Sequence, residues 1–436
     1  MTFGHIRDKI RCNIFLGGKM EIEKIAKLIK QNGGNTYLVG GAVRDAILNK
    51  PIKDEDYCIT GFTSEKFLNL FPMAKSRGKA FEVFDIEGKE FALARKETKV
   101  GKGHKEFEIE TNEDISIEED LKRRDITINS IAQDVLTKEI IDPFGGREDL
   151  ENGIIRATSE KFSEDPLRVY RVARIAANLE FEVSRKTLNM LHKLKGELET
   201  LSKERVFTEF RKALEADKPS IFFNVLREAE VLDVHFKEIY DLIGAIQPIK
   251  YHPEGDSYNH TMLALDNSAK ITKDVKIRFC TLVHDLGKGR TPKEMYPHHY
   301  NHEQRGVEPL RLLCKTLGTP NEWKKMGLTA VLEHMKGGIF NQMTIAKKVS
   351  FIEKIDKSTL GLKGLQIVVY SDRSRNLENE KNDIIDKQYD FYTIGSKMLK
   401  IIDGEYIKNK FKLKPGIEFG KKLHEERVKW LKSNIK

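Results

Sequence analysis

The sequence has few of the features that mark secreted, zinc-binding or membrane-spanning proteins. Its 436 residues include only four cysteines, which are scattered and form no CxxC pair: Cys12, Cys58, Cys280 and Cys314. This spacing argues against structural disulfides and against a cysteine zinc site, and it favours a reducing compartment. No apolar run approaches the ~20 residues of a membrane-spanning helix. The first 20 residues carry only the short apolar stretch Ile14–Leu16 and no A-x-A cleavage pattern. We therefore expect a cytoplasmic protein with no membrane partner.

The chain also lacks an acidic surplus. Lys and Arg number 76 against 67 Asp and Glu, so the formal net charge is +9 at pH 7, and 39% of the residues are hydrophobic. The length suggests two to four domains. A basic surplus suits a polyanion, either nucleic acid or a membrane surface. A basic soluble protein without such a partner would have the same composition, so charge alone leaves both readings open.

Apolar patterning predicts an α+β head followed by a helical remainder. In the first ~155 residues, alternation predicts short strands at NTYLV, DYCIT, AFEVFDI and KEFALAR, and ITINSIAQDV and EIIDPFGG continue in the same style; AVRDAIL reads as a helix. The lysine- and glycine-rich segment 96–108, KETKVGKGHKEFE, reads as a mobile loop. From about Glu160, helical spacing dominates, as in DPLRVYRVARIAANL, SIFFNVLREAEVL, KIRFCTLVHDLG and GVEPLRLLCKTL.

Two acids in the head point to metal-assisted phosphoryl chemistry. If residues 54–59, DEDYCI, form a strand, Asp54 and Asp56 lie on one face and Glu55 faces away, with the two carboxylates ~6–7 Å apart. Paired carboxylates can share divalent cations, and oxygen ligands favour Mg²⁺ or Mn²⁺. Just before them, Gly40-Gly41 ends a strand and opens a helix whose N-terminus suits an anion, and Arg44 lies one turn further on. Each signal alone is common in ordinary structure; their order within ~20 residues favours the site.

These residues resemble the poly(A) polymerase and tRNA nucleotidyltransferase branch of the nucleotidyltransferase superfamily. The matching segments occur in the order GGAVRD with DEDYCI, EEDLKRRDITINSIAQD, EDPLRVYRVARIAA, ERVFTEFRKAL and VHDLGKG. The last resembles the HD phosphohydrolase signature that bacterial CCA-adding enzymes carry as an extra domain. The resemblance runs from about Thr36 to at least His334 and does not cover the N-terminal extension or the tail beyond PGIEFGKKL.

The resemblance implies a role for each matching residue of the head. Asp54 and Asp56 would bind the catalytic Mg²⁺, and Glu90 would be the third acid. Gly41 and Arg44 would contact the triphosphate, and Arg124 and Asp125 would lie near the ribose and phosphates of the incoming nucleotide. The alternative for Arg123-Arg124-Asp125 is a local surface ion pair of under ~1 kcal/mol.

EDPLRVYRVAR has two readings. Asp165 before Pro166 is a good N-cap with proline at the first helical position, in which case Arg168, Arg171 and Arg174 form an exposed basic stripe. In the second reading, which the resemblance favours, Asp165 and Arg168 face the nucleotide and match the Watson–Crick edge of C and then of A, while Arg171 reaches the phosphates.

The region around VHDLGKG supplies imidazoles and a carboxylate. His260, His284 and Asp285 are the expected ligands of a transition metal such as Ni²⁺, with a cluster at His298, His299 and His302 nearby. Ordinary surface histidines are the alternative. The resemblance implies phosphatase, 2′-nucleotidase and 2′,3′-cyclic phosphodiesterase activity there.

The sequence thus predicts an enzyme that adds CCA to the 3′ end of tRNA from CTP and ATP, as a monomer or homodimer. A poly(A) polymerase, a CC-adding enzyme, or an RNA-binding HD phosphohydrolase with an inactive head are the alternatives. The expected domains are an N-terminal extension (1–34), a catalytic head (35–160), a helical nucleotide- and RNA-binding neck and body (161–250), an HD domain (251–345) and a helical tail (346–436).

Overall fold

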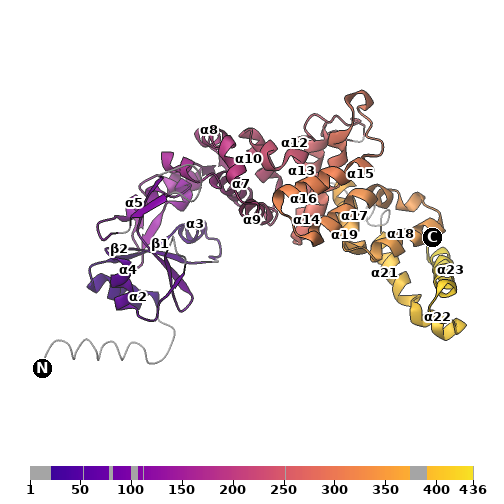
Figure 1. Cartoon of the computed structure of the whole chain (residues 1–436), viewed down its shortest axis with the longest axis horizontal. Coiled ribbons are helices and arrows are strands. Elements are labelled where there is room, and N and C mark those ends of the chain that lie inside the picture. Colours follow the sequence, from indigo (N-terminus) through magenta and orange to yellow (C-terminus); the bar gives the residue numbers. More distant parts are fainter. Residues whose placement is uncertain are drawn as a thin grey trace. The chain divides into compact units, whose positions relative to one another are not determined.

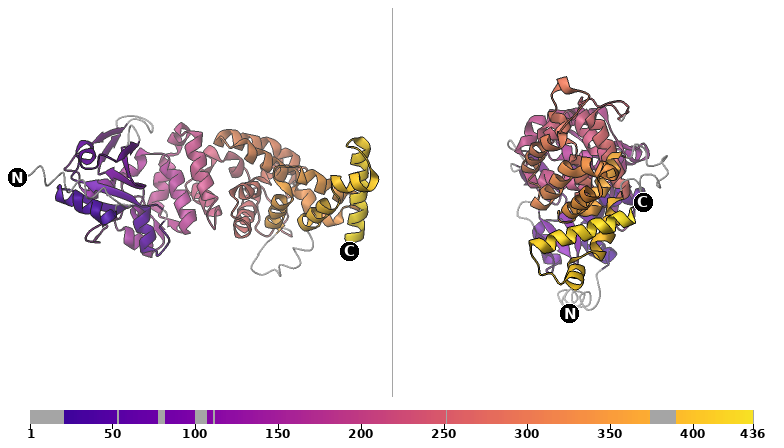
Figure 2. Two further views of the ribbon diagram at one scale, coloured as in Figure 1. Left: turned by 90° about the horizontal axis from the view of Figure 1, so that it is seen from below. Right: turned by 90° about the vertical axis from the view of Figure 1, so that its right-hand side faces the viewer.

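The computed structural model describes residues 21–52, 54–77, 82–99, 107–110, 112–250, 252–373 and 390–435. Its contacts divide the chain into two compact units. The first unit comprises Met1–Arg168 and Phe181–Met190, and the second comprises Val169–Glu180 and Leu191–Lys436. A sheet lies in the first unit and helices make up the second (Figures 1 and 2). The expected α+β fold with a helical remainder is confirmed.

The first unit is built on a seven-stranded mixed sheet of order β3-β4-β5-β2-β1-β8-β9. Strands β2 and β5 run parallel, and the other neighbouring pairs run antiparallel. The strands are β1 (Asn35–Val39), β2 (Asp56–Thr60), β3 (Lys75–Arg77), β4 (Val83–Ile86), β5 (Lys89–Leu93), β8 (Ala132–Asp134) and β9 (Ile140–Ile141). Two smaller pairs are β6 (Lys96–Lys99) with β7 (Phe107–Glu110), and β10 (Ile154–Ile155) with β11 (Glu182–Val183).

Helices cover both faces of this sheet because the strands alternate their side chains. Tyr57 and Ile59 of β2 join a core with helices α2 and α4, whereas Cys58 faces a second core that contains Leu121 of α5. The helices of the first unit are α2 (Ile22–Gln31), α3 (Gly41–Ile47), α4 (Ser64–Leu70), α5 (Ile117–Lys122) and α6 (Gly146–Glu151), with 3₁₀ turns η1 (Thr127–Asn129) and η2 (Glu160–Glu164).

Three expectations for the first unit need correction. Helix α2 lies inside the segment assigned to an N-terminal extension, yet its Ile25 and Ile29 are fully buried in the head's core. The segment ITINSIAQDV forms a strand only at Ala132–Asp134, because Thr127–Asn129 close a 3₁₀ turn. Both ends of the expected mobile loop 96–108 pair as β6 and β7, and residues 100–106 lie outside the described residues.

The second unit is a succession of helices, as the helical periodicity predicted. Its first part comprises α7 (Arg168–Leu179, of which Arg168 belongs to the first unit), α8 (Arg185–Lys193, shared between the units), η3 (Lys195–Thr200), α9 (Lys203–Ala213), α10 (Ser220–Glu228), α11 (Leu232–His235) and α12 (Lys237–Tyr240).

The middle part comprises α13 (Ser257–Ile271), α14 (Val275–Val283), η4 (Leu286–Arg290), η5 (Lys293–Met295), α15 (His302–Arg305), α16 (Val307–Leu317), α17 (Asn321–Gly338), η6 (Phe340–Gln342), α18 (Ile345–Asp356) and α19 (Gly361–Arg373). The last helices are α21 (Phe391–Ile401), α22 (Gly404–Phe411) and α23 (Ile417–Asn434). Within the described residues, no helix combines the length and apolar character needed to cross a membrane.

Candidate active sites

The three predicted acids of the head gather where strand β2 begins. Asp56 is the first residue of β2, and its register partners are Glu90 on the parallel strand β5 and Val39 at the end of β1. Register partners on neighbouring strands are ~5 Å apart and point to the same face, so Asp56 and Glu90 lie side by side. Asp54 precedes the strand, which spans the predicted DYCIT and does not extend back to Asp54. All three acids are exposed to solvent.

Charge at this edge is set by a second acid and an arginine. Asp56 remains open to solvent, but the protein around it displaces part of its hydration and so raises the pKa of its carboxyl; the positive charge of Arg124 opposes that effect, and the negative charge of Asp54 adds to it. A carboxylate beside another carboxylate favours a bound cation, because the cation relieves the repulsion. The arrangement suits divalent metal ions held by oxygen ligands.

The predicted glycine turn brings backbone and arginines close to these acids. Gly40 has a φ of +71°, a conformation that favours glycine, and a Cβ there would lie 3.1 Å from an Nη atom of Arg124. Arg44, one turn into α3, donates from Nη1 to the side-chain oxygen of Asn129 at 2.7 Å and pairs with Asp45 at 2.7 Å. The turn, Arg44 and Arg124 therefore line one end of the sheet next to Asp56.

Arg123 and Arg124 share a buried partner that the sequence analysis missed. The carboxylate of Asp120, fully buried in α5, accepts hydrogen bonds from Arg123 at 2.6 Å and from Arg124 at 3.1 Å. Burial would raise the pKa of Asp120, but the two arginines outweigh it and lower that pKa to about 2. The surface ion-pair reading of this motif is therefore wrong, since the pair is anchored in the core. The i, i+3 and i, i+4 spacing from Asp120 was a signal available in the sequence.

Asp125 is part of the scaffold that holds Arg44. It is buried, and its Oδ1 accepts hydrogen bonds from the Ile126 backbone at 2.9 Å and from the Asn129 amide at 3.4 Å. Because Asn129 in turn accepts from Arg44, the RRD-x-T-I-N segment reaches the glycine-turn helix through its asparagine.

Asp165 and Arg168 lie together, but not on the predicted helix turn. Helix α7 begins at Arg168, two residues after the Pro166 start of the N-cap reading, and the Asp165 carboxylate accepts from the backbone N–H of Leu167 at 3.0 Å. Arg168 is buried, so the exposed-stripe reading fails. Its guanidinium donates to the carbonyls of Lys161 at 2.8 Å and Arg123 at 2.7 Å. Arg171 belongs to the second unit.

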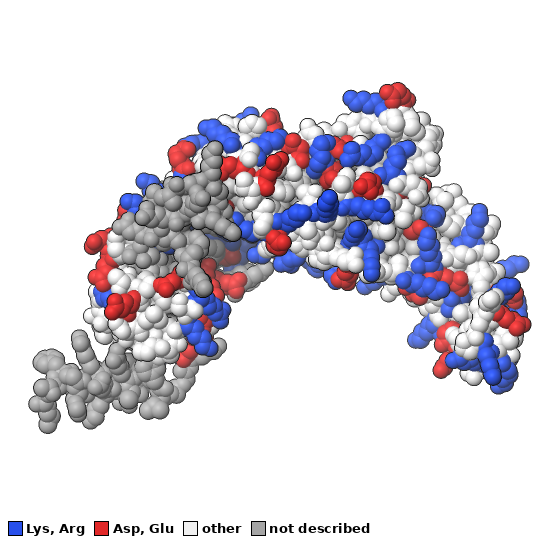
Figure 3. Space-filling view, viewed as in Figure 1, with Lys and Arg blue, Asp and Glu red and all other residues white. Residues whose placement is uncertain are grey.

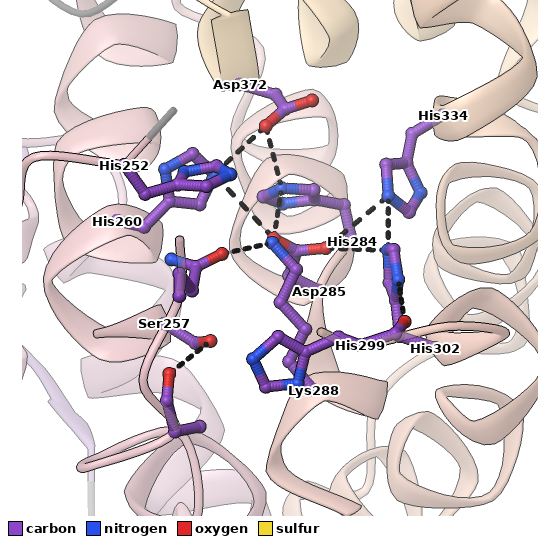
Figure 4. A network of polar contacts seen from close by, with 12 residues as sticks. His252, Ser257, His260, His284, Asp285, Lys288, His299, His302, His334 and Asp372 are labelled. Atoms are coloured by element: carbon purple, nitrogen blue, oxygen red, sulfur yellow. Dashed lines mark hydrogen bonds and ion pairs between the residues drawn. The ribbon is translucent and has the colours of Figure 1, made fainter. Parts of the chain in front are cut away.

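In the second unit, five side chains from five segments converge on the carboxylate of Asp285 (Figure 4). Helix α14 ends at Val283, so His284 and Asp285 project together from the break before η4, as predicted. The Oδ2 atom of Asp285 lies 3.2 Å from Nε2 of His284 and 3.6 Å from Nε2 of His260. Asp372, at the end of α19, completes this first set, with its Oδ1 atom 2.9 Å from Nε2 of His260.

A second set lies on the other oxygen of the same carboxylate. The Oδ1 atom of Asp285 is 3.1 Å from Nε2 of His302 and 3.4 Å from Nε2 of His334. The two imidazole Nε2 atoms are themselves 3.1 Å apart. Asp285 therefore faces one set of ligands with each oxygen.

Hydrogen bonds to the backbone orient three imidazoles in a way that suits metal binding. The Nδ1 atoms of His284, His302 and His334 lie 2.6, 2.8 and 3.0 Å from the carbonyl oxygens of Thr281, His299 and Ala330. A carbonyl can only accept, so each Nδ1 carries the proton and each Nε2 presents a lone pair to the cluster.

His260 is oriented by a carboxylate. Its Nδ1 lies 2.7 Å from Glu254, which also contacts Nδ1 of His252 at 3.0 Å. Burial favours the carboxylic acid form of Glu254, but these two contacts outweigh it and lower the pKa of Glu254. A carboxylate behind a ligating histidine is a common way to fix its tautomer.

The cluster fits metal ions. Nitrogen and oxygen ligands of one ion at about 2.1 Å lie about 3.0–3.4 Å from each other, which matches the spacing here. Nε2 of His284 and both oxygens of Asp285 are buried, and among the described residues they lack a hydrogen bond of acceptable geometry, although charged groups lie close by. Burial lowers the pKa of His284, but Asp285 and Asp372 outweigh it and raise that pKa to about 10, so the site favours a positive charge.

The sequence analysis found part of this cluster. His260, His284 and Asp285 lie where predicted, but His334 and Asp372 were missed, and Asp372 lies beyond the predicted HD segment. Of the cluster predicted at 298–302, only His302 is a candidate ligand. His299 instead contacts the Thr291 hydroxyl at 2.8 Å and the Ile246 carbonyl at 3.0 Å.

Three family models match successive parts of the chain. The family models described as "Poly A polymerase head domain", "Probable RNA and SrmB- binding site of polymerase A" and "HD domain" match residues 36–156, 180–242 and 257–360. The chain is 44% identical over 327 residues to the Multifunctional CCA protein of Shewanella denitrificans, covering 73% of this chain and 78% of the relative. It is 45% identical over 303 residues to that of Mannheimia succiniciproducens, covering 67% and 72%.

Solved structures share the fold at lower identity. The Bacillus stearothermophilus CCA-adding enzyme in complex with CTP matches with a TM-score of 0.60 and 22% identity, over 95% of this chain and 93% of that one. A CCA-adding enzyme with ATP matches with a TM-score of 0.63 and 17% identity, over 95% and 91%.

The protein is thus an enzyme with a nucleotidyltransferase head and an HD domain. More particularly, the chain belongs to the family of multifunctional CCA proteins, as the sequence motifs predicted.

Proposed function

We propose that this protein adds the sequence CCA to the 3′ end of tRNA without a template, using CTP and ATP, and that its HD domain hydrolyses phosphoesters. The observation that carries the first activity is the placement of Asp56 beside Glu90, next to the glycine turn and Arg124. The relatives' printed names and the nucleotides in the titles of the solved structures support the same reading.

In the proposed head site, Asp54, Asp56 and Glu90 would hold Mg²⁺. When bound, the ion would stabilise charge on the attacking and leaving oxygens of the phosphoryl transfer. The backbone at Gly41 and the guanidinium of Arg44 would bind the triphosphate, since both lie at the start of α3.

The remaining head residues would position the nucleotide. Arg124, which Asp120 anchors near Asp56, would contact the incoming nucleotide, and Asp125 would act on Arg44 through Asn129. Asp165 and Arg168 would match the base edge, and the two carbonyls that hold the Arg168 guanidinium support this role because they fix its orientation. Arg171 would contact phosphates.

The basic surface of the helical unit supports an RNA partner. Lys and Arg side chains are spread over the visible face of that unit (Figure 3). Around α22 and α23, five exposed lysines lie within a short stretch: Lys408, Lys410, Lys412, Lys414 and Lys421. Such contacts bind phosphates without reading sequence, so tRNA affinity should fall steeply with added salt.

The product formed on a tRNA that lacks its 3′ CCA tests the head function. With CTP and ATP in Mg²⁺, three added nucleotides are expected, ending in A. A long A tail would indicate a poly(A) polymerase, two added nucleotides a CC-adding enzyme, and no addition an inactive head. Asp56→Asn should abolish addition and leave tRNA affinity nearly unchanged, and substantial turnover by this variant would overturn the metal assignment.

The proposed hydrolytic activity of the HD domain is supported mainly by the carboxylate of Asp285, which is buried between two sets of imidazoles without a hydrogen bond of acceptable geometry among the described residues. His260, His284, Asp285 and Asp372 would hold one ion, and Asp285, His302 and His334 a second. Imidazole ligands favour Ni²⁺ or another transition metal over Mg²⁺. A bound ion would supply an activated water for phosphoester hydrolysis.

The hydrolytic activity is tested with 2′,3′-cyclic AMP and 2′-AMP in the presence of Ni²⁺ or Mn²⁺. Asp285→Ala should abolish hydrolysis and leave CCA addition within a few-fold of the wild type, whereas Asp56→Asn should do the reverse. Loss of both activities in either variant would overturn the two-site assignment.

We also propose that the protein acts in the cytoplasm as a monomer or homodimer. The three cysteines within the described residues, Cys58, Cys280 and Cys314, are buried and free of disulfides, which suits a reducing compartment.

A further inference from the structure

An exposed aromatic pair lies on the wall of the pocket that contains the Asp285 cluster. The pocket has a volume of about 630 Å³ and is lined both by candidate ligands, among them Asp285 and Asp372, and by His298 and Tyr300. The two rings are stacked, with centroids 5.4 Å apart and planes inclined by 19°. Neither ring takes part in the ligand sets, so the proposed hydrolysis leaves them without a role.

Tyr300 presents a flat apolar surface to the pocket. One face of its ring is covered by His298, yet the residue is 65% exposed, so much of the ring remains accessible. Pro297 and the partly exposed Met335 line the same pocket. Met335 follows the candidate ligand His334 in α17, so the apolar wall of the pocket lies next to the ligand cluster.

The loop that carries Tyr300 is held in place by hydrogen bonds on both sides. His299 bridges the Thr291 hydroxyl and the Ile246 carbonyl, and Arg305 donates to the carbonyl of Tyr300 and to Thr291 at 3.3 Å. An aromatic ring fixed in advance loses little entropy when a ligand stacks on it.

We propose that Tyr300, supported by His298, is a stacking platform for the base of a nucleoside phosphate whose phosphate group lies at the Asp285 cluster. The proposal rests on the hydrolytic function proposed above. A volume of this size accommodates a small ligand such as a nucleotide, and bases of every kind stack on aromatic rings. Beside the cluster, the ammonium of Lys288, 2.5 Å from Asp285, supplies positive charge for the phosphate. A base next to a phosphate group is present both in free nucleotides and at the 3′ end of an RNA, so either could be the ligand.

The test compares substrates that differ in the base. The full-length enzyme with Ni²⁺ or Mn²⁺ hydrolyses 2′-AMP, which yields adenosine and phosphate, or glycerol 2-phosphate, which has no base. Tyr300→Ala should lower kcat/KM for 2′-AMP by about five- to 150-fold, the range for loss of base stacking, and leave glycerol 2-phosphate within about twofold. Tyr300→Phe should retain activity on both substrates, because it keeps the ring.

The matched control is Tyr240→Ala, since Tyr240 is also an exposed tyrosine of the second unit and does not line the pocket. It should change neither rate. An equal loss on both substrates in Tyr300→Ala, or no loss on either, overturns the platform. A parallel arm uses a short RNA ending in a 2′,3′-cyclic phosphate. If the base effect is larger on this RNA than on the free nucleotide, the RNA end is the ligand source, and the converse identifies free nucleotides.

A measurement without turnover separates this proposal from the hydrolytic function. If the wild type hydrolyses no substrate with any metal, the hydrolase proposal fails, and photolabelling with 8-azido-2′-AMP then decides on the platform. Labelling of the peptide that contains Tyr300, reduced in Tyr300→Ala and unchanged in Tyr240→Ala, supports it. Absence of label from that peptide overturns it.

Discussion

Replacing Asp120 by asparagine should loosen the head because it removes the buried charge that holds two arginines. The carboxylate side chain is 1% exposed and pairs with Arg123 and Arg124. Its pKa falls from 3.8 to about 2 in the folded state, a difference that corresponds to about 2 kcal/mol. Breaking a buried pair by removing one partner costs up to ~3–5 kcal/mol. We therefore expect Asp120→Asn to lower the stability of the head by about 2–4 kcal/mol.

The assay must report on the head alone, because a chain with two units does not unfold in one step. Trp323 and Trp430 both belong to the second unit, so tryptophan fluorescence would miss the change. Native-state hydrogen exchange, read by mass spectrometry on peptides from α5 and β1, gives the opening free energy of the head itself. Peptides from α13 and α14 in the second unit should keep their protection.

The matched control is Glu118→Gln, which removes a negative charge from an exposed position of the same helix. Its effect should stay within about 0.5 kcal/mol. If Asp120→Asn differs from this control by less than about 0.5 kcal/mol, the buried pair does not stabilise the head. Because Arg124 would lose its anchor beside Gly40, the variant should also raise KM for CTP and ATP, and an unchanged KM would refute the positioning role.

Three further outcomes are expected. Lowering the pH from about 4 to about 2 should reduce the stability of the head by about 2 kcal/mol through Asp120. The lowered pKa stabilises the folded head fully only above the pKa of the unfolded state, and this contribution is lost as the pH falls through the folded-state pKa. In hydrogen exchange measured over this pH range, Asp120→Asn should not show this loss. Asp165→Asn keeps the capping contact to Leu167 but loses the charge, so a change in relative kcat/KM among the four nucleotides would identify base reading, and unchanged values would leave only a cap. Asp372→Asn should lower bound Ni²⁺ by about one ion per chain in elemental analysis of the dialysed protein, whereas an unchanged metal content would remove Asp372 from the ligand set.

Local patterns in the sequence were sufficient to predict most of the head. Strand β1, the glycine turn and helix α3 follow one another as expected, because alternation and glycine act over a few residues. Helix α2 was missed although its signal was local, since Ile22, Ile25 and Ile29 stand at helical spacing. What the spacing alone did not show is that Ile25 and Ile29 pack into the core of the head.

The environment of Arg123 and Arg124 could not be predicted from the sequence for a different reason. Charged residues in sequence suggest a solvated surface, and that was the alternative reading of Arg123 and Arg124. Their partner Asp120 lies between the buried residues Ile117 and Leu121, and it faces the core because helix α5 buries that side. The spacing could have identified the ion pairs, but only burial makes them strong enough to position Arg124 at the acids.

Only some of the candidate HD ligands could be predicted from the sequence. His284 and Asp285 are adjacent and carry a motif, so they could be assigned directly. His334 and Asp372 stand in helices α17 and α19 without any local sign of function. They become candidate ligands only because these helices pack against α14, which brings their side chains close to Asp285.

The two candidate sites differ in how they would hold metal ions, because they differ in exposure. The acids Asp54, Asp56 and Glu90 are exposed at a sheet edge, where a hydrated divalent ion could arrive and leave with a nucleoside triphosphate. The candidate HD ligands are buried and backbone carbonyls fix several of their imidazoles, which would suit an ion that stays with the protein while substrates exchange. The ammonium of Lys288, 2.5 Å away, offsets part of the charge of the buried Asp285 carboxylate, and a cation held by the imidazoles would offset it further, so a bound ion would also stabilise the fold around it.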